Sequence, residues 1–243
     1  MTLSIVRSFL SAAAATVGFS STAMACGCGG VMSSITAFKN SDLVFVGKIV
    51  SADPPKAPPR KNVPGYGSGA SSGAAIVTFE VTHMYSGSAA PRIVIVNGGV
   101  DCDEPFAKNE VWLVYAKLQN GRVTASKCSR TRLVANASSD LTYLDGIEQR
   151  RPQGILYGEV LRRITDAKGQ PALQGLFEPM QVIAASNGRR VEATTDPGGY
   201  YQMVLPPGDY TVSVERKGQP VGETQSVHIA EGKDQQLRLI ANY

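Results

Sequence analysis

The chain has 243 residues, of which 43% are hydrophobic, 18% charged and 7% aromatic, as in ordinary globular proteins and unlike disordered or fibrous ones. Its net charge of +4 is too small and too dispersed for a nucleic-acid-binding protein, which would carry a basic stripe. His83 and His228 are its only histidines, which argues against a histidine-based metal site or catalytic triad. We therefore expect no cofactor, no metal ion of its own and no nucleic-acid partner.

The N-terminus has the pattern of an export signal. An apolar run over residues 9–19 is too short to span a bilayer, and the AMA sequence that ends at Ala25 fits the small-x-small rule of signal peptidase. We expect cleavage between Ala25 and Cys26, no transmembrane segment, and a secreted or periplasmic protein. The alternative is a surface lipoprotein with a lipid anchor at Cys26, although Ala23 stands where lipoprotein signals usually have Leu.

The mature chain would contain four cysteines, and in an oxidising compartment this even number predicts two disulfides. Three pairings are possible. A bond between Cys26 and Cys28 would close a very tight ring and is the least favoured. Both other pairings tie the N-terminus to the distant Cys102 and Cys128. The alternative is a metal site, for which Cys-x-Cys without a supporting histidine is weak evidence.

The first part of the mature chain predicts five strands and two helices. Alternating apolar residues indicate strands over 42–51, 75–85, 92–97, 110–117 and 122–126. Helices are expected over 33–40, with Ser33 or Ser34 as N-cap, and over 138–150, with Leu141, Leu144 and Ile147 at helical spacing. The Pro-, Gly- and Ser-rich segment 53–75 predicts a long exposed loop.

From residue 154 the pattern changes to short strands separated by Gly- and Pro-containing turns. Seven strands are expected, over 155–161, 180–186, 191–195, 200–204, 210–215, 226–229 and 236–240, and this number and spacing favour a small β-sandwich. The sequence thus predicts an export signal over 1–25, a first domain over 26–150 and a second over 151–243. Both domains are all-β.

Four segments of the first domain carry a resemblance to a known family. CGCGG followed by ITAFKNSDLVFVGKIVS closely resembles the start of the tissue inhibitors of metalloproteinases. DCDEPFAKNEVWLVYAK and TASKCSRTRLV resemble the surroundings of that family's third and fourth framework cysteines. The resemblance covers residues 26–150 and implies a five-stranded OB-like, netrin-like barrel with flanking helices, with the pairings Cys26–Cys102 and Cys28–Cys128. Lys39 stands where the family has a further cysteine, and the second half of the animal inhibitors is absent, so this part of the chain looks like a bacterial relative.

The resemblance implies a specific inhibitory mechanism. In the family, the α-amino group and carbonyl oxygen of the first cysteine chelate the catalytic zinc of the protease and displace its water, and the next residue enters the specificity pocket. Here Cys26 would chelate the target zinc, and Gly27 and Cys28 would contact the target. An α-amino pKa of about 8 leaves a useful neutral fraction near pH 7. Gly27 has no side chain to fill a pocket. In the simpler interpretation, Cys26 and Cys28 only hold the N-terminus on the barrel.

The stretch ATTDPGGYYQMVLPPGDYTVSVERKGQ is similar to carboxypeptidase regulatory-like, transthyretin-like modules, which are related to Cna B-type domains. Such modules are usually accessory domains or stalks. The first strand of this domain has no lysine, so we expect no isopeptide bond. Tyr200 and Tyr201, with the other strand tyrosines, are expected to alternate between core and surface.

One acidic and one basic cluster are the remaining candidate site residues. Asp101, Asp103 and Glu104 flank Cys102 and are expected to form a solvated turn rather than a calcium site. Arg130 and Arg132 follow Cys128 and supply positive charge without an identified partner. The sequence as a whole favours an exported, non-enzymatic binding or interaction protein of the cell envelope or extracellular space, with a protein partner. The alternative is an inhibitor whose partner is a zinc metalloproteinase.

Overall fold

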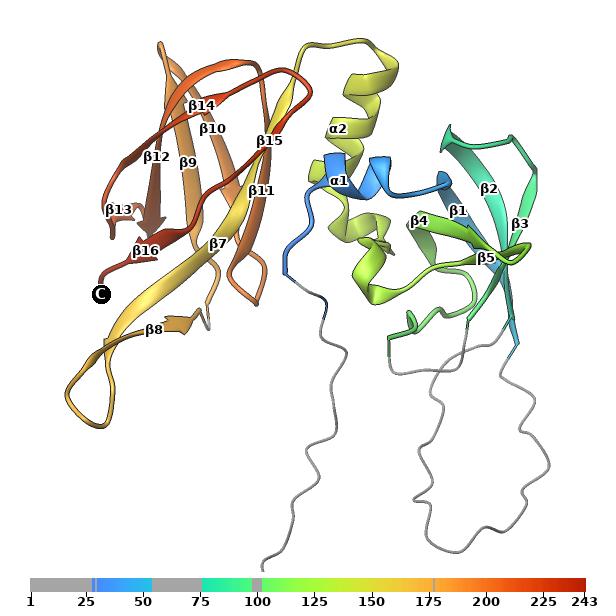
Figure 1. Ribbon diagram of the computed structural model, residues 1–243, viewed down its shortest axis with the longest axis horizontal. Coiled ribbons are helices and arrows are strands. Elements are labelled where there is room, and N and C mark those ends of the chain that lie inside the picture. Colours follow the sequence, from blue (N-terminus) through green and yellow to red (C-terminus); the bar gives the residue numbers. More distant parts are fainter. Residues whose placement is uncertain (1–27, 29, 54–75, 98–101, 177) are drawn as a thin grey trace, which may run out of the picture.

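The computed structural model describes residues 28, 30–53, 76–97, 102–176 and 178–243, as a β-barrel and a β-sandwich with two helices between them (Figure 1). The expected all-β fold, a five-stranded barrel with short helices joined to a sandwich, is confirmed. The predicted export signal with its cleavage site, Cys26, Gly27 and residues 54–75 of the expected loop lie outside the described residues. Within the described part of the chain, no helix is long and apolar enough to cross a membrane.

The barrel is a sheet that closes on itself. Its strands follow the order β1-β2-β3-β5-β4, and β4 pairs back to β1 with Leu43 opposite Ala116 and Lys48 opposite Val111. A short strand, β6, extends the other edge of β4, and two 3-10 turns flank it. The elements are β1 (Leu43–Asp53), β2 (Ile76–Ser86), β3 (Arg92–Val96), β4 (Val111–Gln119), β5 (Arg122–Thr124), η1 (Lys127–Ser129), β6 (Arg132–Leu133) and η2 (Val134–Asn136).

Aromatic side chains fill the barrel. Phe45, Phe79, Phe106 and Trp112 form a chain of edge-to-face contacts, with ring centroids 5.5, 5.3 and 4.9 Å apart. All four are at most 6% exposed. Phe45 and Phe79 come from the paired strands β1 and β2, where inward and outward residues alternate.

The sandwich consists of two sheets that pack face to face, and most of their strand pairs are antiparallel. One sheet has the order β10-β9-β12-β13, with β14 also paired to β12. In the other, β7 pairs with β11, β8, β15 and β16. The strands are β7 (Gly154–Thr165), β8 (Pro171–Gly175), β9 (Gln181–Ser186), β10 (Arg189–Thr194), β11 (Tyr200–Leu205), β12 (Gly208–Arg216), β13 (Gln219–Pro220), β14 (Gln225–Ile229), β15 (Asp234–Gln236) and β16 (Leu239–Ala241).

The last expected strand, 236–240, is divided into β15 and β16, which both run parallel to β7. The chain between them approaches β7 so closely that a Cβ at Gly158 would lie 1.9 Å from the backbone oxygen of Leu237. Leu237 also donates its amide to the Tyr157 carbonyl at 2.9 Å. This close approach depends on a glycine in a different strand, so the local sequence of the last strand does not reveal the break.

The helices α1 (Ser34–Lys39) and α2 (Ser138–Glu148) lie between the barrel and the sandwich (Figure 1). Ser33 caps α1, as one of the two expected N-cap residues. A third apolar cluster here combines residues of both domains, including Ile35, Leu113, Tyr115, Leu144 and Ile155. Burial of this shared cluster stabilises the contact between the domains.

The buried face of α2 differs from the expected one. Ile147, expected on the apolar face, is 37% exposed, whereas Asp140 is fully buried. Gly146 is also buried, and the amide of Gln153 packs against it. The helix therefore turns a carboxylate and a glycine inward, and the reason lies in the partners of Asp140.

Candidate functional site

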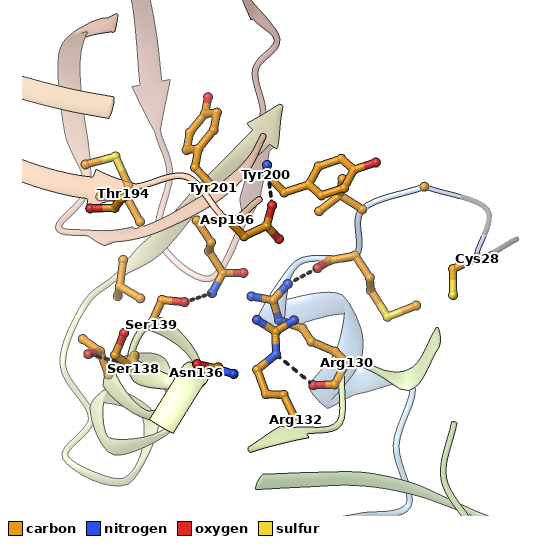
Figure 2. Close-up of a pocket in the computed structure, with 18 of the residues that line it drawn as sticks. Cys28, Arg130, Arg132, Asn136, Ser138, Ser139, Thr194, Asp196, Tyr200 and Tyr201 are labelled. Atoms are coloured by element: carbon orange, nitrogen blue, oxygen red, sulfur yellow. Dashed lines mark hydrogen bonds between the residues drawn. The ribbon is translucent and has the colours of Figure 1, made fainter. Parts of the chain in front are cut away.

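A cleft of about 700 Å³ lies between the barrel and the sandwich, and its walls come from both (Figure 2). Arg130, Arg132 and residues at the start of α2 line the barrel side. Residues 191–194 of β10, Asp196 and residues 200–204 of β11 line the sandwich side. The volume is within the range of about 300–1,000 Å³ that is typical of ligand sites.

Arg130 builds the barrel wall of the cleft by binding a buried carboxylate. Its Nε and Nη2 donate to the two oxygens of Asp140 at 2.5 and 3.1 Å, and its Nη1 donates to the Met32 carbonyl at 2.5 Å. The backbone of Arg130 has a φ of 69°, in the left-handed region, directly after η1. Because Asp140 and Met32 bind all three nitrogens of the guanidinium, we interpret Arg130 as a structural residue.

Asp140 collects further donors from the barrel and from α1. Its Oδ1 accepts from Ser34 Oγ at 2.7 Å and from the Tyr115 hydroxyl at 3.1 Å. Burial, together with the negative charge of Asp140, raises the pKa of Tyr115 far above its usual range, so the hydroxyl stays protonated as a donor. The carboxylate of Asp140, on α2, therefore binds side chains from α1, from β4 and from Arg130, the residue that follows η1.

The contacts around Asp140 extend to the sandwich through Gln202 on β11. Gln202 Oε1 accepts from the Ser34 amide at 2.9 Å, and its Nε2 donates to Ser34 Oγ at 2.6 Å and to Ser139 Oγ at 3.2 Å. A second link joins α1 to the start of β15, where Asp234 accepts from Ser33 and, at 2.9 Å, from Thr36. The described contacts between the domains are therefore polar as well as apolar.

Arg132 presents its guanidinium to the cleft. The side chain is 35% exposed, its Nε donates to the Arg130 carbonyl at 3.3 Å, and its Nη1 lies 3.8 Å from Asp140 Oδ2. Burial lowers the pKa of the Arg132 guanidinium, the nearby Arg130 lowers it further, and Asp140 and Asp196 oppose this. A cation that is partly desolvated and only weakly paired is suited to bind an anionic group.

The carboxylates of the sandwich wall already have partners. Asp196 Oδ1 accepts from the amides of Gly198 and Tyr200 at 2.8 and 3.0 Å, which fixes the turn before β11 (Figure 2). Glu192 is paired with Arg190 at 2.7 Å. Tyr200 is 40% exposed and Tyr201 is buried, so these tyrosines alternate between surface and core as expected.

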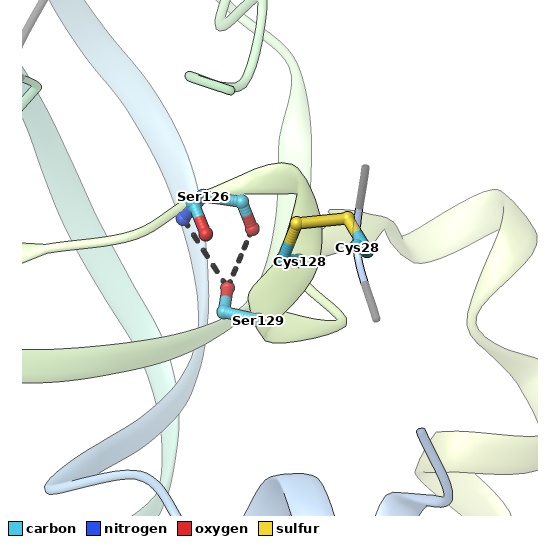
Figure 3. Close-up of a disulfide and its surroundings, with 4 residues drawn as sticks. All are labelled: Cys28, Ser126, Cys128 and Ser129. Atoms are coloured by element: carbon cyan, nitrogen blue, oxygen red, sulfur yellow. Dashed lines mark hydrogen bonds between the residues drawn. A yellow bond between two sulfur atoms is a disulfide. The ribbon is translucent and has the colours of Figure 1, made fainter. Parts of the chain in front are cut away.

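A disulfide joins Cys28 to Cys128, in η1, at the edge of the cleft (Figure 3). This is one of the two pairings that the family resemblance implies. Cys102 is also disulfide-bonded. Cys26 and Gly27 lie outside the described residues, so the Cys26–Cys102 pairing, zinc chelation by Cys26 and target contact by Gly27 stay predictions.

The expected solvated turn around Cys102 is wrong for two of its three acidic residues. Asp103 and Glu104 are 8% and 7% exposed, and Asp101 lies outside the described residues. Burial raises the pKa of Glu104 to about 7, although Lys127 and Arg132 act in the opposite direction. Hence Glu104 is a carboxyl group that titrates near neutral pH close to two cations of the cleft.

Sequence reasoning found the basic residues of the cleft but not their partners. The sequence indicates the positive charge of Arg130 and Arg132, but nothing in the local sequence distinguishes Asp140 and Gln202 from exposed polar residues. His83 and His228 lie apart, each with a carboxylate partner, Glu148 and Asp209 respectively. Among the described residues, no group of three or more His, Cys, Asp or Glu side chains is arranged to hold a metal ion.

One protein-family model matches most of the sandwich. Residues 161–241 match the family model of the carboxypeptidase regulatory-like domain, which confirms that part of the resemblance seen in the sequence. No curated protein matches the chain.

Several solved structures show a weak likeness. The TIE protein of Bacillus anthracis is 18% identical with a TM-score of 0.28, over 37% of this chain and 16% of that one. A DUF3823 family protein from Bacteroides ovatus is 15% identical with a TM-score of 0.26, over 36% of this chain and 44% of that one. The minor pilin GBS52 of Streptococcus agalactiae is 11% identical with a TM-score of 0.27, over 83% of each chain. The chain covers less than half the length of the TIE protein and of the DUF3823 family protein. At such low TM-scores the likeness says nothing about function.

Because Glu104 is buried, we expect the free energy of unfolding of the protein to depend on pH. In the unfolded chain its pKa is the usual 4.5, and in the folded protein about 7, so the folded state binds the proton more tightly. The stabilising effect of this proton is present below pH 4.5 and is lost as the pH rises to about 7. Relative to wild type, Glu104→Gln should therefore gain unfolding free energy between pH 4.5 and 8, by up to roughly 3 kcal/mol at 1.36 kcal/mol per pKa unit.

Urea unfolding followed by the fluorescence of Trp112, the single tryptophan of the chain, measures this difference. Glu80→Gln, at an exposed position of β2, is the matched control and should show no such trend. A wild-type to Glu104→Gln difference that stays constant with pH would contradict the interpretation.

Proposed function

We propose that this chain is an exported, non-enzymatic binding protein of the cell envelope or extracellular space that holds a protein partner in the cleft between barrel and sandwich. In this proposal residues 1–25 are the export signal, residues 26–150 form an inhibitor-like barrel domain and residues 151–243 form the regulatory-like sandwich domain. The supporting observation is that the cleft has walls from both domains, which buried polar contacts hold together. A preformed site costs little conformational entropy when it binds.

The charges of the cleft support binding rather than catalysis. Glu192 is paired with Arg190, and Asp196 is held by two backbone amides, so neither carboxylate is placed as a general base. Arg130 is bound to Asp140. Cys28 and Cys128 are joined in a disulfide and supply no thiolate nucleophile. The side chains that remain available, such as those of Arg132 and Tyr200, are suited to recognition.

A fragment screen tests whether this cleft is the binding site. Small polar and aromatic fragments are titrated into the isotope-labelled protein, and amide shifts are recorded by NMR. We expect hits at millimolar affinity to shift amides on both walls, such as those of Ser139 and Ala193, more than amides elsewhere.

A variant that fills the cleft provides the control. Thr142→Trp, at an exposed position of the cleft wall, should weaken these hits at least about tenfold. Lys108→Trp, in an exposed turn that does not line the cleft, should leave them unchanged. Fragments that bind mainly to another surface would contradict the proposal.

A second candidate function is inhibition of a zinc metalloproteinase by the amine and carbonyl of Cys26. The observation that favours it is the Cys28–Cys128 disulfide, which fastens the chain two residues after Cys26 to the closed five-stranded barrel. This is the arrangement that the family resemblance implies. An anchored N-terminus would hold the amine and the carbonyl oxygen in place for a metal ion.

An inhibition assay on a panel of zinc proteases separates this candidate from the first. The protein starting at Cys26 should inhibit at least one protease, and Cys26→Ser should abolish that inhibition. An extra alanine before Cys26 is a sharper variant, because it displaces the α-amino group by one residue and keeps every cysteine. It should also lose inhibition, by at least about a hundredfold if the metal bond supplies a few kcal/mol. Inhibition that survives the added alanine, or none from the protein itself, rules this candidate out.

A further inference from the structure

We propose that the occupant of the cleft is an extended segment of a partner protein, which adds as a strand to the open edge of β10 and directs a carboxylate to Arg132. This inference rests on the proposed function and names the partner's chemistry. Its structural basis is a sheet edge and a cationic wall that face the same cleft.

β10 is the terminal strand of its sheet, and β9 is its single partner in the described part of the chain. The amide of Thr195 donates to the Met180 carbonyl at 2.9 Å, directly after the pairing of Thr194 with Gln181. In an antiparallel ladder, hydrogen-bonded and non-bonded residues alternate. The backbone groups of Val191 and Ala193 therefore face β9, and those of Arg190, Glu192 and Thr194 point away from the sheet.

The open edge faces the cleft, because four consecutive residues of β10, from Val191 to Thr194, line it. At about 3.3 Å per residue these four span about 13 Å, enough for a short strand to pair alongside. Unpaired edge groups of this kind are the usual template for strand addition, in which the backbone supplies affinity and the side chains supply specificity.

The barrel wall of the cleft, across from β10, indicates which charge the docked segment carries. Lys127, Arg130 and Arg132 line this wall, and Asp140 lies beneath it. Asp140 neutralises Arg130 at hydrogen-bond distance, whereas the guanidinium of Arg132 lies 3.8 Å from that carboxylate and presents a positive charge to the cleft. Arg132 is 35% exposed, its Nε donates to the Arg130 carbonyl and its Nη1 faces Asp140, so Nη2 is the nitrogen placed to donate to a carboxylate in the cleft. We therefore expect glutamate or aspartate in the docked segment.

Two synthetic peptides serve as probes. The first is a short acetylated peptide of alternating valine and threonine in which two threonines are replaced by glutamate, and the second has glutamine in place of glutamate. At saturation with the first peptide, hydrogen exchange of the Glu192 and Thr194 amides should slow at least tenfold, whereas the Val191 and Ala193 amides, already bonded to β9, should change little. The glutamate peptide should bind about tenfold or more tighter than the glutamine peptide, as expected for a charge-assisted contact.

Charge variants test the role of the wall. Arg132→Gln should reduce affinity for the glutamate peptide about tenfold and leave the glutamine peptide unaffected. Arg163→Gln, an exposed arginine outside the cleft, is the matched control and should change neither affinity. Because Arg132 also contacts Asp140, Arg132→Lys replaces Arg132→Gln if the latter fails to fold: it keeps a positive charge near Asp140 but removes the guanidinium, and it should weaken binding of the glutamate peptide and leave the glutamine peptide unaffected.

Three results would overturn the inference. If fragments bind in the cleft but neither peptide does, the partner is not an extended strand and the proposed function stands. If a peptide binds without the alternating protection of β10, strand addition is wrong. If the edge amides become protected without peptide as protein concentration rises, the occupant is a second copy of this chain. Absence of fragment binding in the cleft, by contrast, rejects the proposed function itself.

Discussion

The ion pair between Arg130 and Asp140 is the interaction on which the arrangement of the two domains depends. The side chain of Asp140 has no exposed surface and that of Arg130 is 7% exposed, so both charges are removed from water. Such a pair is tolerated only when further hydrogen bonds satisfy the groups, and here Ser34, Tyr115 and Met32 supply them. Loss of one partner leaves an uncompensated buried charge and is strongly destabilising.

This pair also explains why the cleft has a defined shape. Ser34 contacts Asp140 on the barrel side and Gln202 on the sandwich side, so a single α1 residue links the ion pair to β11. Arg130 and Arg132 stand on the opposite side of the cleft from β10 and β11. Walls from two domains can recognise a partner with specificity only when their separation is fixed. A buried polar network, which has one well-satisfied geometry, is suited to fix it.

Sequence patterns predicted the parts of this protein that local residues determine. Alternation in β1 and β2 predicted the barrel strands, and the turn-separated strands of the sandwich were found in the same way. The division between β15 and β16 was missed because it depends on Gly158 in a distant strand. The buried face of α2 was misassigned because Asp140 is buried by partners that lie 10, 25 and 106 residues away, at Arg130, Tyr115 and Ser34. Composition and periodicity contain no information about such contacts.

The most direct test of this account compares two carboxylates of the same helix. Asp140→Ala removes the buried partner of Arg130, and Glu148→Ala removes the partner of His83 in a pair whose side chains are 47% and 42% exposed. Urea unfolding, followed by the fluorescence of Trp112, measures both losses. We expect the free energy of unfolding to fall by about 3–5 kcal/mol for Asp140→Ala and by about 0.5 kcal/mol or less for Glu148→Ala. Equal, small losses for the two variants would contradict the central role of the buried pair.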